Sequence, residues 1–143
     1  MHPPVKLRGR VCAAYSAAAR DPRGSHPFPL GREFAASVGY PEGVLARLPE
    51  ASVAAFSGVS NLPLTAAVAP GATVADIGCG AGMDSLILAE RTGPDGRVIG
   101  IDFSPDMLAV ARAGASSPHI FFCCAGAEKM PLAGDSVDCA FVN

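Results

Sequence analysis

Asp76-Ile77-Gly78-Cys79-Gly80-Ala81-Gly82 is the stretch of this sequence that decides its fold. It joins a short apolar run, Thr73–Ile77, to a segment of helical composition over residues 81–91. Glycines allow tight turns and let a ligand approach the main chain closely. A helix that begins here directs free N–H groups and the positive end of its dipole toward the turn. The stretch therefore predicts a binding turn, suited to a carboxylate or a phosphate.

A second acid, Asp102, ends the next apolar run, Arg97–Asp102, about 20 residues after the glycines. A carboxylate at this place can accept hydrogen bonds from both hydroxyls of a ribose. The two features together predict an adenosine-type ligand across the carboxyl ends of the strands. Met83 stands where the dinucleotide fingerprint requires a glycine, so a nicotinamide-binding domain is the less favoured alternative.

Strands and helices alternate after Pro70. Ser104 has the character of a helix N-cap, with Pro105 in the first helical position, and Gly93 follows the preceding helix. This alternation predicts an α/β fold with a parallel sheet and right-handed crossovers. The expected elements are strands over 73–77, 97–102, 119–123 and 137–142, and helices over 81–91 and 105–114.

Residues 1–69 differ in composition from the rest of the chain and are rich in Ala and Pro. They predict short helices with irregular joints, because Pro removes an N–H donor and fixes φ. The expected helices cover 11–20, 32–38, 43–48 and 50–56, with a non-helical stretch over 21–29. We therefore divide the chain into an N-terminal helical cover, 1–69, and a ligand-binding half, 70–143.

Composition narrows the classes of function. The chain has 143 residues, of which 50% are hydrophobic and 17% charged, with a net charge of -2. These values argue against a disordered segment and against nucleic acid as the main partner. No apolar stretch is long enough to span a membrane and no signal core is present, so we expect a cytoplasmic protein. The five cysteines include no CxxC pair, which predicts free thiols and no metal site.

The glycine stretch, with an acid two places before it, resembles motif I of the class I S-adenosylmethionine-dependent methyltransferases. The resemblance implies that S-adenosyl-L-methionine is the cofactor and that the fold is Rossmann-like. It also implies a site role for each residue of the two motifs. Gly78, Gly80 and Gly82, with Cys79 between them, would shape the pocket for the methionine end. Asp76 would lie near the amino group, and Asp102, followed by Phe103, would hold the ribose.

Three further segments resemble the arsenite methyltransferases: residues 39–42, 93–108 and 127–132. The quinone C-methyltransferases share parts of the last two. The resemblance implies methyl transfer to a small-molecule acceptor. It also implies that Tyr15, near the end of the first helix, reaches the cofactor, although a half-buried packing role for Tyr15 stays open. Ala127 and Glu128 would lie near the adenine.

The sequence also departs from that family. Val59 stands where a family cysteine would be, and Gly126 stands where an acid would face the adenine. Soft arsenic(III) prefers thiolate ligands, so the acceptor stays open between an arsenite-like and a quinone-type molecule. A non-catalytic adenosine-ligand-binding module that needs a partner chain is a further alternative. Asp84 is interpreted as a first-turn residue that complements the helix dipole.

The family fold has seven strands, and about four parallel strands can be counted here. We therefore expect a C-terminally incomplete domain with little activity by itself. The fourth strand would then have an open apolar edge, which favours self-association. The residues expected to be exposed or partly exposed there are Val137, Cys139, Ala140, Phe141 and Val142.

Overall fold

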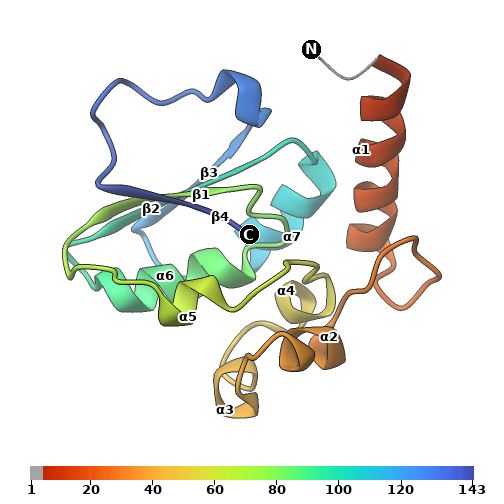
Figure 1. Ribbon diagram of the computed structural model, residues 1–143, viewed down its shortest axis with the longest axis horizontal. Helices are drawn as coiled ribbons and strands as arrows, with labels where there is room; N and C mark the ends of the chain where they lie inside the picture. Colours follow the sequence, from red (N-terminus) through yellow and green to blue (C-terminus); the bar gives the residue numbers. More distant parts are fainter. Residues whose placement is uncertain (1–4) are drawn as a thin grey trace.

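The computed structural model describes residues 5–143. It combines one parallel sheet with seven α-helices and one short 3-10 helix in this part of the chain, and Figure 1 shows α1, α2 and α4 gathered at one end of the sheet. The helices are α1 Val5–Arg20, α2 Arg32–Ser37, α3 Glu42–Leu45, α4 Glu50–Ala54, α5 Leu62–Thr65, α6 Met83–Thr92, α7 Pro105–Gly114 and η1 Ala127–Lys129.

The strands run parallel in the order β3-β2-β1-β4. Their bounds are β1 Thr73–Ile77, β2 Arg97–Asp102, β3 Ile120–Cys124 and β4 Cys139–Val142. The chain proceeds from β1 outward to β3 and then returns to the other side of β1. The strand order therefore reverses at β1, and in open α/β sheets ligands bind at the carboxyl ends of the strands beside such a reversal. The α/β class predicted from the sequence is confirmed.

The two crossover helices lie close to where the sequence predicts them. Helix α7 has the predicted bounds, whereas α6 covers Met83–Thr92 and not 81–91, because Gly82 before it is left-handed. The Ser104 hydroxyl accepts a hydrogen bond from the Met107 N–H at 3.3 Å, which caps the start of α7, and Pro105 occupies the first turn. Helix α6 begins after Gly82 and ends at Gly93, whose φ of 73° only glycine adopts readily. Since β1, β2 and β3 follow one another in one direction, right-handed crossovers place α6 and α7 on the same face of the sheet.

Three apolar clusters join the N-terminal helices to the sheet. The first packs Tyr40, Leu45 and Phe56 against Met83 and Ile87 of α6. The second lies between α6 and the sheet and contains Val74, Leu88, Val98 and Phe141. The third is built of small side chains and Met107, and it fixes α1 and α4 on α7 and the glycine turn. The N-terminal helices are therefore held at the carboxyl end of the sheet.

The N-terminal boundaries differ from the sequence prediction. Helix α1 begins by Val5 and not at residue 11, because good helix formers around Gly9 outweigh its low propensity. Helix α3 ends at Leu45, and the chain continues in tighter turns, in which the Arg47 N–H donates to the Val44 carbonyl and the Leu48 N–H to the Leu45 carbonyl. Helix α5 was not predicted; Pro63 lies in its first turn. Strands β3 and β4 each begin one or two residues later than expected.

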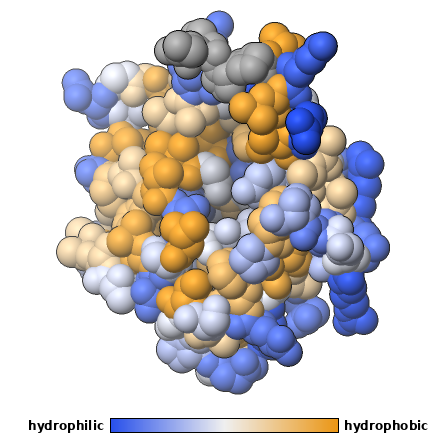
Figure 2. Space-filling model, turned by 45° about the vertical axis from the view of Figure 1, so that its right-hand side comes forward, coloured by the Kyte–Doolittle hydropathy of each residue, from blue (hydrophilic) through white to orange (hydrophobic). Residues whose placement is uncertain are grey.

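Strand β4 pairs with β1 alone among the described residues. Ala140 and Val142 are exposed on it, as predicted, but Phe141 is only 5% exposed. The prediction that Phe141 is open to solvent is therefore wrong, because its ring packs in the cluster under α6. Apolar residues also reach the surface elsewhere, at Val5 and Phe121 among others, and Figure 2 shows such residues gathered on one face.

In the described part of the chain, no helix combines the length and the apolar character that crossing a bilayer requires.

Candidate functional site

The glycine turn forms the floor of the candidate site. Gly78, Gly80 and Gly82 have φ values of 74°, 53° and 83°, a region that side chains disfavour. A Cβ atom at Gly78 or Gly80 would meet nothing within 4 Å, whereas one at Gly82 would lie 2.9 Å from the Ala111 Cβ of α7. The first two glycines are therefore needed for backbone conformation, and Gly82 also for close packing.

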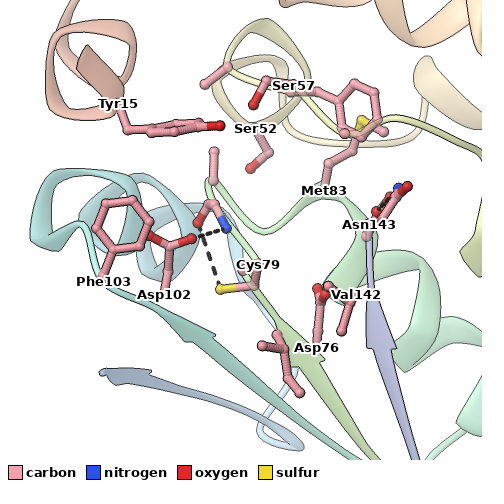
Figure 3. Close-up of a pocket in the computed structure, with 18 residues that line it drawn as sticks. Tyr15, Ser52, Ser57, Asp76, Cys79, Met83, Asp102, Phe103, Val142 and Asn143 are labelled. Carbon is pink, nitrogen blue, oxygen red and sulfur yellow. Dashed lines mark hydrogen bonds between the residues drawn. The ribbon is translucent and has the colours of Figure 1, made fainter. Parts of the chain in front are cut away.

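A cavity of about 200 Å³ lies above this turn (Figure 3). The carboxyl ends of β1, β2 and β4 line one side of it, and residues from α1, α4 and the loop after α4 line the other. The structure brings eight of the predicted site residues to this cavity or its turn: Tyr15, Asp76, Gly78, Cys79, Gly80, Gly82, Asp102 and Phe103. Of these, Gly82 lies at the start of α6 behind the lining.

Asp102 is fixed at the end of β2 by the main chain. Its Oδ2 accepts a hydrogen bond from the Gly80 N–H at 2.9 Å, and its Oδ1 accepts one from the Ser104 N–H at 2.8 Å. Burial raises the pKa of Asp102, and these backbone hydrogen bonds oppose the rise. A carboxylate has about four acceptor positions, so Asp102 can still accept from a ligand.

Asp76 is the most deeply buried acid of the site, at 2% exposure. Its Oδ2 accepts a hydrogen bond from the Ser85 hydroxyl at 2.6 Å. Burial, and then the charge of Asp84, raise the pKa of Asp76 to about 7, against the opposing effect of Ser85. Asp76 can therefore gain or lose a proton near neutral pH.

Asp84 is a cavity residue that the sequence analysis assigned to the helix dipole. It lies in the first turn of α6, as expected, but it is only 7% exposed and lines the cavity. The Tyr40 hydroxyl donates to its Oδ1, and Asn143 Nδ2 donates to its Oδ2 at 2.8 Å. Burial raises the pKa of Asp84 and these two donors oppose the rise; burial and the charge of Asp84 raise the pKa of Tyr40. The interpretation of Asp84 as a helix-dipole residue is therefore incomplete.

Asn143 also ties β4 to the loop after α4. Its Oδ1 accepts hydrogen bonds from the Ser60 N–H at 2.9 Å and the Ser60 hydroxyl at 2.7 Å, and its Nδ2 donates to the Ser60 carbonyl at 2.8 Å. The position of Asn143 at the end of a parallel strand is the signal that could have identified it.

Aromatic rings and two serine hydroxyls cover the cavity. Tyr15 stacks on Phe28 with ring centroids 4.7 Å apart and meets Phe103 edge-on at 5.8 Å. Ser52 and Ser57 reach the cavity from α4 and the loop after it (Figure 3). Ser52 is 0% exposed, and its Oγ is the one buried side-chain N or O atom without a hydrogen-bond partner in residues 5–143. Nothing in the sequence indicated either serine.

Ala127 and Glu128 are not brought to this cavity. They line a neighbouring groove of about 590 Å³ with Arg8 and Val11 of α1, and Phe103 lines both spaces. Glu128 forms an ion pair with Arg8, and a Cβ at position 126 would collide with both side chains. The sequence prediction grouped these residues into one site, whereas the structure divides them between two adjoining spaces with Phe103 lining both.

The cysteines do not form a cluster suited to a metal ion: residues 5–143 contain no group of three or more His, Cys, Asp or Glu with that arrangement. All five thiols are free, and Cys79 is the one that lines the cavity. Burial raises the pKa of the Cys79 thiol, and the charge of Asp76 adds to this. Cys79 is therefore a poor thiolate.

The family comparison matches residues 74–143 to the methyltransferase domain. An arsenite methyltransferase of Halobacterium salinarum is 38% identical over 89 residues, which cover 60% of this chain and 23% of that protein. A 2-phytyl-1,4-naphtoquinone methyltransferase of Trichormus variabilis is 37% identical over 75 residues, covering 50% of this chain and 33% of that protein. The matched segments thus span a third or less of these relatives.

Two solved structures share the fold. A chain from the complex of the Haloferax volcanii Trm112 methyltransferase activator with a methyltransferase superposes with a TM-score of 0.57, at 25% identity, over 88% of this chain and 45% of that chain. A SAM-dependent methyltransferase from Aquifex aeolicus gives a TM-score of 0.50, at 27% identity, over 52% of this chain and 41% of that chain. The predicted Rossmann-like arrangement is therefore confirmed.

Proposed function

We propose that this chain, whose residues 74–143 match the methyltransferase-domain family, binds S-adenosylmethionine in the acidic cavity for transfer of its methyl group to a small-molecule acceptor, with little turnover expected of this chain alone. One observation carries the proposal: the glycine turn meets two buried carboxylates, Asp76 and Asp102, at the carboxyl ends of neighbouring strands. A ligand with an amino acid end and a nucleoside end fits this site. Its ammonium group and its hydroxyls can donate to the carboxylates, and the glycine turn lets it approach the main chain closely.

The charged groups of the cavity fit the methionine end. Oδ1 of Asp76 has no hydrogen-bond partner among residues 5–143, so it can accept from an ammonium group. The spare acceptor positions of Asp102 suit the ribose hydroxyls. Gly78 and Gly80 carry no side chains, so the space above the main chain of the turn is open to a ligand.

The nucleoside end extends toward the neighbouring groove in this proposal. A cavity of about 200 Å³ is smaller than the 300–1,000 Å³ typical of small-molecule sites, so it holds only part of the ligand. The groove beyond Phe103 supplies about 590 Å³ more, between α1 and the turn at Ala127 and Glu128. The base would lie there, beside the Phe103 ring.

The N-terminal segment acts as a cover in this proposal, with 1–69 and 70–143 as the two functional parts. Tyr15, Ser52 and Phe56 of its described part line the cavity opposite the strands. A cover of this kind excludes water and holds the reactants in line, which is most of what methyl transfer needs from a protein. When bound, the cofactor supplies a methyl group already activated by its positive sulfur.

The acceptor is proposed to be arsenite-like, with a quinone-type carbon acceptor as the alternative. An acceptor with its own lone pair needs no general base, whereas a carbon or oxygen acceptor does. In this proposal Asp76 is engaged by the ammonium group and Asp102 by the ribose. Asp84 has donors on both oxygens and Cys79 is held as a thiol, so neither of these remaining groups is a ready base. This favours the arsenite-like acceptor, although Cys79 alone supplies a thiol to the cavity.

Calorimetric titration with S-adenosylmethionine tests the proposal, with NAD as the control ligand. We expect saturable binding of S-adenosylmethionine alone. Asp102→Asn should weaken binding about tenfold or more, because hydrogen bonds to a charged group contribute about 1.5–3 kcal/mol. Asp95→Asn is the matched control, since Asp95 is exposed in the turn before β2, at the other end of that strand.

The proposal would be wrong if the folded chain bound neither ligand, or if Asp95→Asn and Asp102→Asn affected binding equally. A circular dichroism melt of each sample shows whether the protein is folded. Turnover assays with arsenite and with a demethylated quinone then separate the two acceptor classes.

A further inference from the structure

The lining of the cavity is well suited to an ammonium group and poorly suited to a carboxylate. Asp76, Asp84 and Asp102 are 2%, 7% and 7% exposed, and Lys, Arg and His are missing from the residues that line the cavity. Carboxyl groups that are charged repel a second carboxylate, most strongly where little water screens them. The carboxylate of an amino acid ligand therefore needs uncharged donors here.

The N–H groups of the glycine turn are mostly taken within the fold. Their acceptors are the Ile101 carbonyl, the Cys79 carbonyl and Oδ2 of Asp102, at 2.7 to 3.0 Å. The Ala81 N–H is the one in residues 78–82 without such a partner in the described part of the chain. The turn therefore offers a carboxylate fewer free N–H groups than its sequence predicts. The N–H groups already used are those of Gly78, Cys79, Gly80 and Gly82.

The side chains of the lining include one donor that is both buried and unmet. Both N–H bonds of the Asn143 side chain donate within the fold. The hydroxyls of Tyr15 and Ser57 belong to partly exposed residues, so water can reach them. Ser52 is 0% exposed, and its Oγ has no hydrogen-bond partner among residues 5–143. A buried hydroxyl without a partner is costly, which indicates that a polar ligand completes it.

Ser52 lies where α4 meets the glycine turn. Ala55, just after α4, belongs to the same apolar cluster as Ala81 of the turn. Ser52 precedes Ala55 by three residues and so lies on the same side of the helix. Figure 3 shows the Ser52 hydroxyl directed into the space above the turn. Gly114 of α7 leaves room for this hydroxyl, because a Cβ atom at Gly114 would lie 3.0 Å from Ser52 Oγ.

We infer that the Ser52 hydroxyl donates a hydrogen bond to the carboxylate of the cofactor, beside the free Ala81 N–H. The inference rests on the proposed function and assigns a cofactor-binding residue to the helical cover. The ammonium group then lies toward Asp76 and the carboxylate toward α4. The two charged groups of the amino acid end are thus held from opposite sides of the cavity, and the ligand links the cover to the sheet.

Calorimetry of the full chain with S-adenosylmethionine and with decarboxylated S-adenosylmethionine tests the inference. The two ligands share their sulfonium, ammonium and nucleoside groups, so the difference between them reports the carboxylate. We expect Ser52→Ala to weaken binding of S-adenosylmethionine about tenfold, and to leave binding of the decarboxylated ligand within about twofold. Ser52→Cys, with a weaker donor, should give an intermediate loss for S-adenosylmethionine alone.

Ser37→Ala is the matched control. Ser37 is an exposed serine of the cover, at the end of α2, and it does not line the cavity. Its hydroxyl donates to the Phe34 carbonyl at 2.7 Å. We expect this variant to bind both ligands as the wild-type chain does.

An unchanged affinity of Ser52→Ala for S-adenosylmethionine, or an equal loss for both ligands, would overturn the inference and leave the proposed function intact. A circular dichroism melt shows whether each variant is folded, and Ser52→Cys gives the same comparison if Ser52→Ala does not fold. If neither ligand bound to the folded wild-type chain, the proposed function would fail and the inference with it.

Discussion

The sheet half of the molecule and its helical cover contribute different groups to the same cavity. The strand ends and α6 supply the three carboxyl groups and the open glycine turn. The cover supplies aromatic rings and hydroxyls, of which Tyr15 and Ser52 are the clearest, and no charge. The charged groups of the cavity thus lie on the sheet side, and its rings and uncharged hydroxyls on the side of the cover. Substitutions on the two sides should therefore have effects of different kinds.

The largest expected effect is a pH dependence of stability that comes from the sheet side. The folded-state pKa of Asp76 is about 7 against an ordinary value of 3.8, so between these values the folded chain binds more protons than the unfolded chain. Stability should therefore fall as pH rises from about 4 to 7, by up to about 4 kcal/mol from this group. Urea unfolding at pH 5 and pH 7.5 measures the fall, which Asp76→Asn should reduce. An unchanged slope in that variant would assign the effect to other acids.

A second large effect is expected within the glycine turn. Gly82→Ala combines a left-handed φ with a Cβ only 2.9 Å from Ala111, and should destabilise the chain by about 3 kcal/mol. Gly80→Ala meets no atom within 4 Å and should cost only the backbone strain, about 1–2 kcal/mol. Urea unfolding of both variants compares them. Equal losses would mean that packing against α7 contributes nothing.

Tyr40→Phe tests the link between the cover and the sheet side. The variant removes the hydroxyl that donates to Asp84 and keeps the ring in the first apolar cluster. We expect a loss of about 1–3 kcal/mol, because a buried carboxylate would lack a donor. Tyr15→Phe is the matched control, since no hydrogen bond of the Tyr15 hydroxyl is found in residues 5–143. Thermal unfolding at neutral pH should separate the two variants.

The smallest effect expected is a gain in stability on the cover side. Ser52→Ala removes a buried hydroxyl without a partner and should stabilise the empty chain by about 1 kcal/mol. Ser16→Ala removes a buried hydroxyl that lies 3.3 Å from the Ser104 hydroxyl and should destabilise it by a similar amount. Opposite signs in thermal unfolding would support this difference. A loss in both would show that Ser52 has a role in the empty structure.

The strand–helix half was predicted almost to the residue. The bounds of β1, β2 and α7 agree with the expected ranges, and Ser104 caps α7 as its sequence position indicates. These elements follow from local periodicity and from cap and turn residues, which act over a few positions of the chain. The short helices of the cover were placed less well, because they are stabilised by packing more than by their own sequence.

Some residues of the candidate site were predicted from the sequence, and others were not. The glycine turn and the acids Asp76 and Asp102 could be identified because each stands beside a recognisable strand end. Asn143 also follows a strand end but was not singled out, and Ser52 gave no such signal. Ala127 and Glu128 were grouped with the turn by resemblance, whereas the structure places them in the adjoining groove.

The sequence by itself determined the α/β order, the glycine turn and the two acids at the strand ends, because local spacing encodes all of them. Only the tertiary structure decided what faces the turn. The pairs that do so are far apart along the chain: Tyr40 and Asp84 are 44 residues apart, Asp84 and Asn143 are 59, and Ser16 and Ser104 are 88. Contacts at such separations depend on how whole helices pack on the sheet, and no short stretch of sequence carries that information.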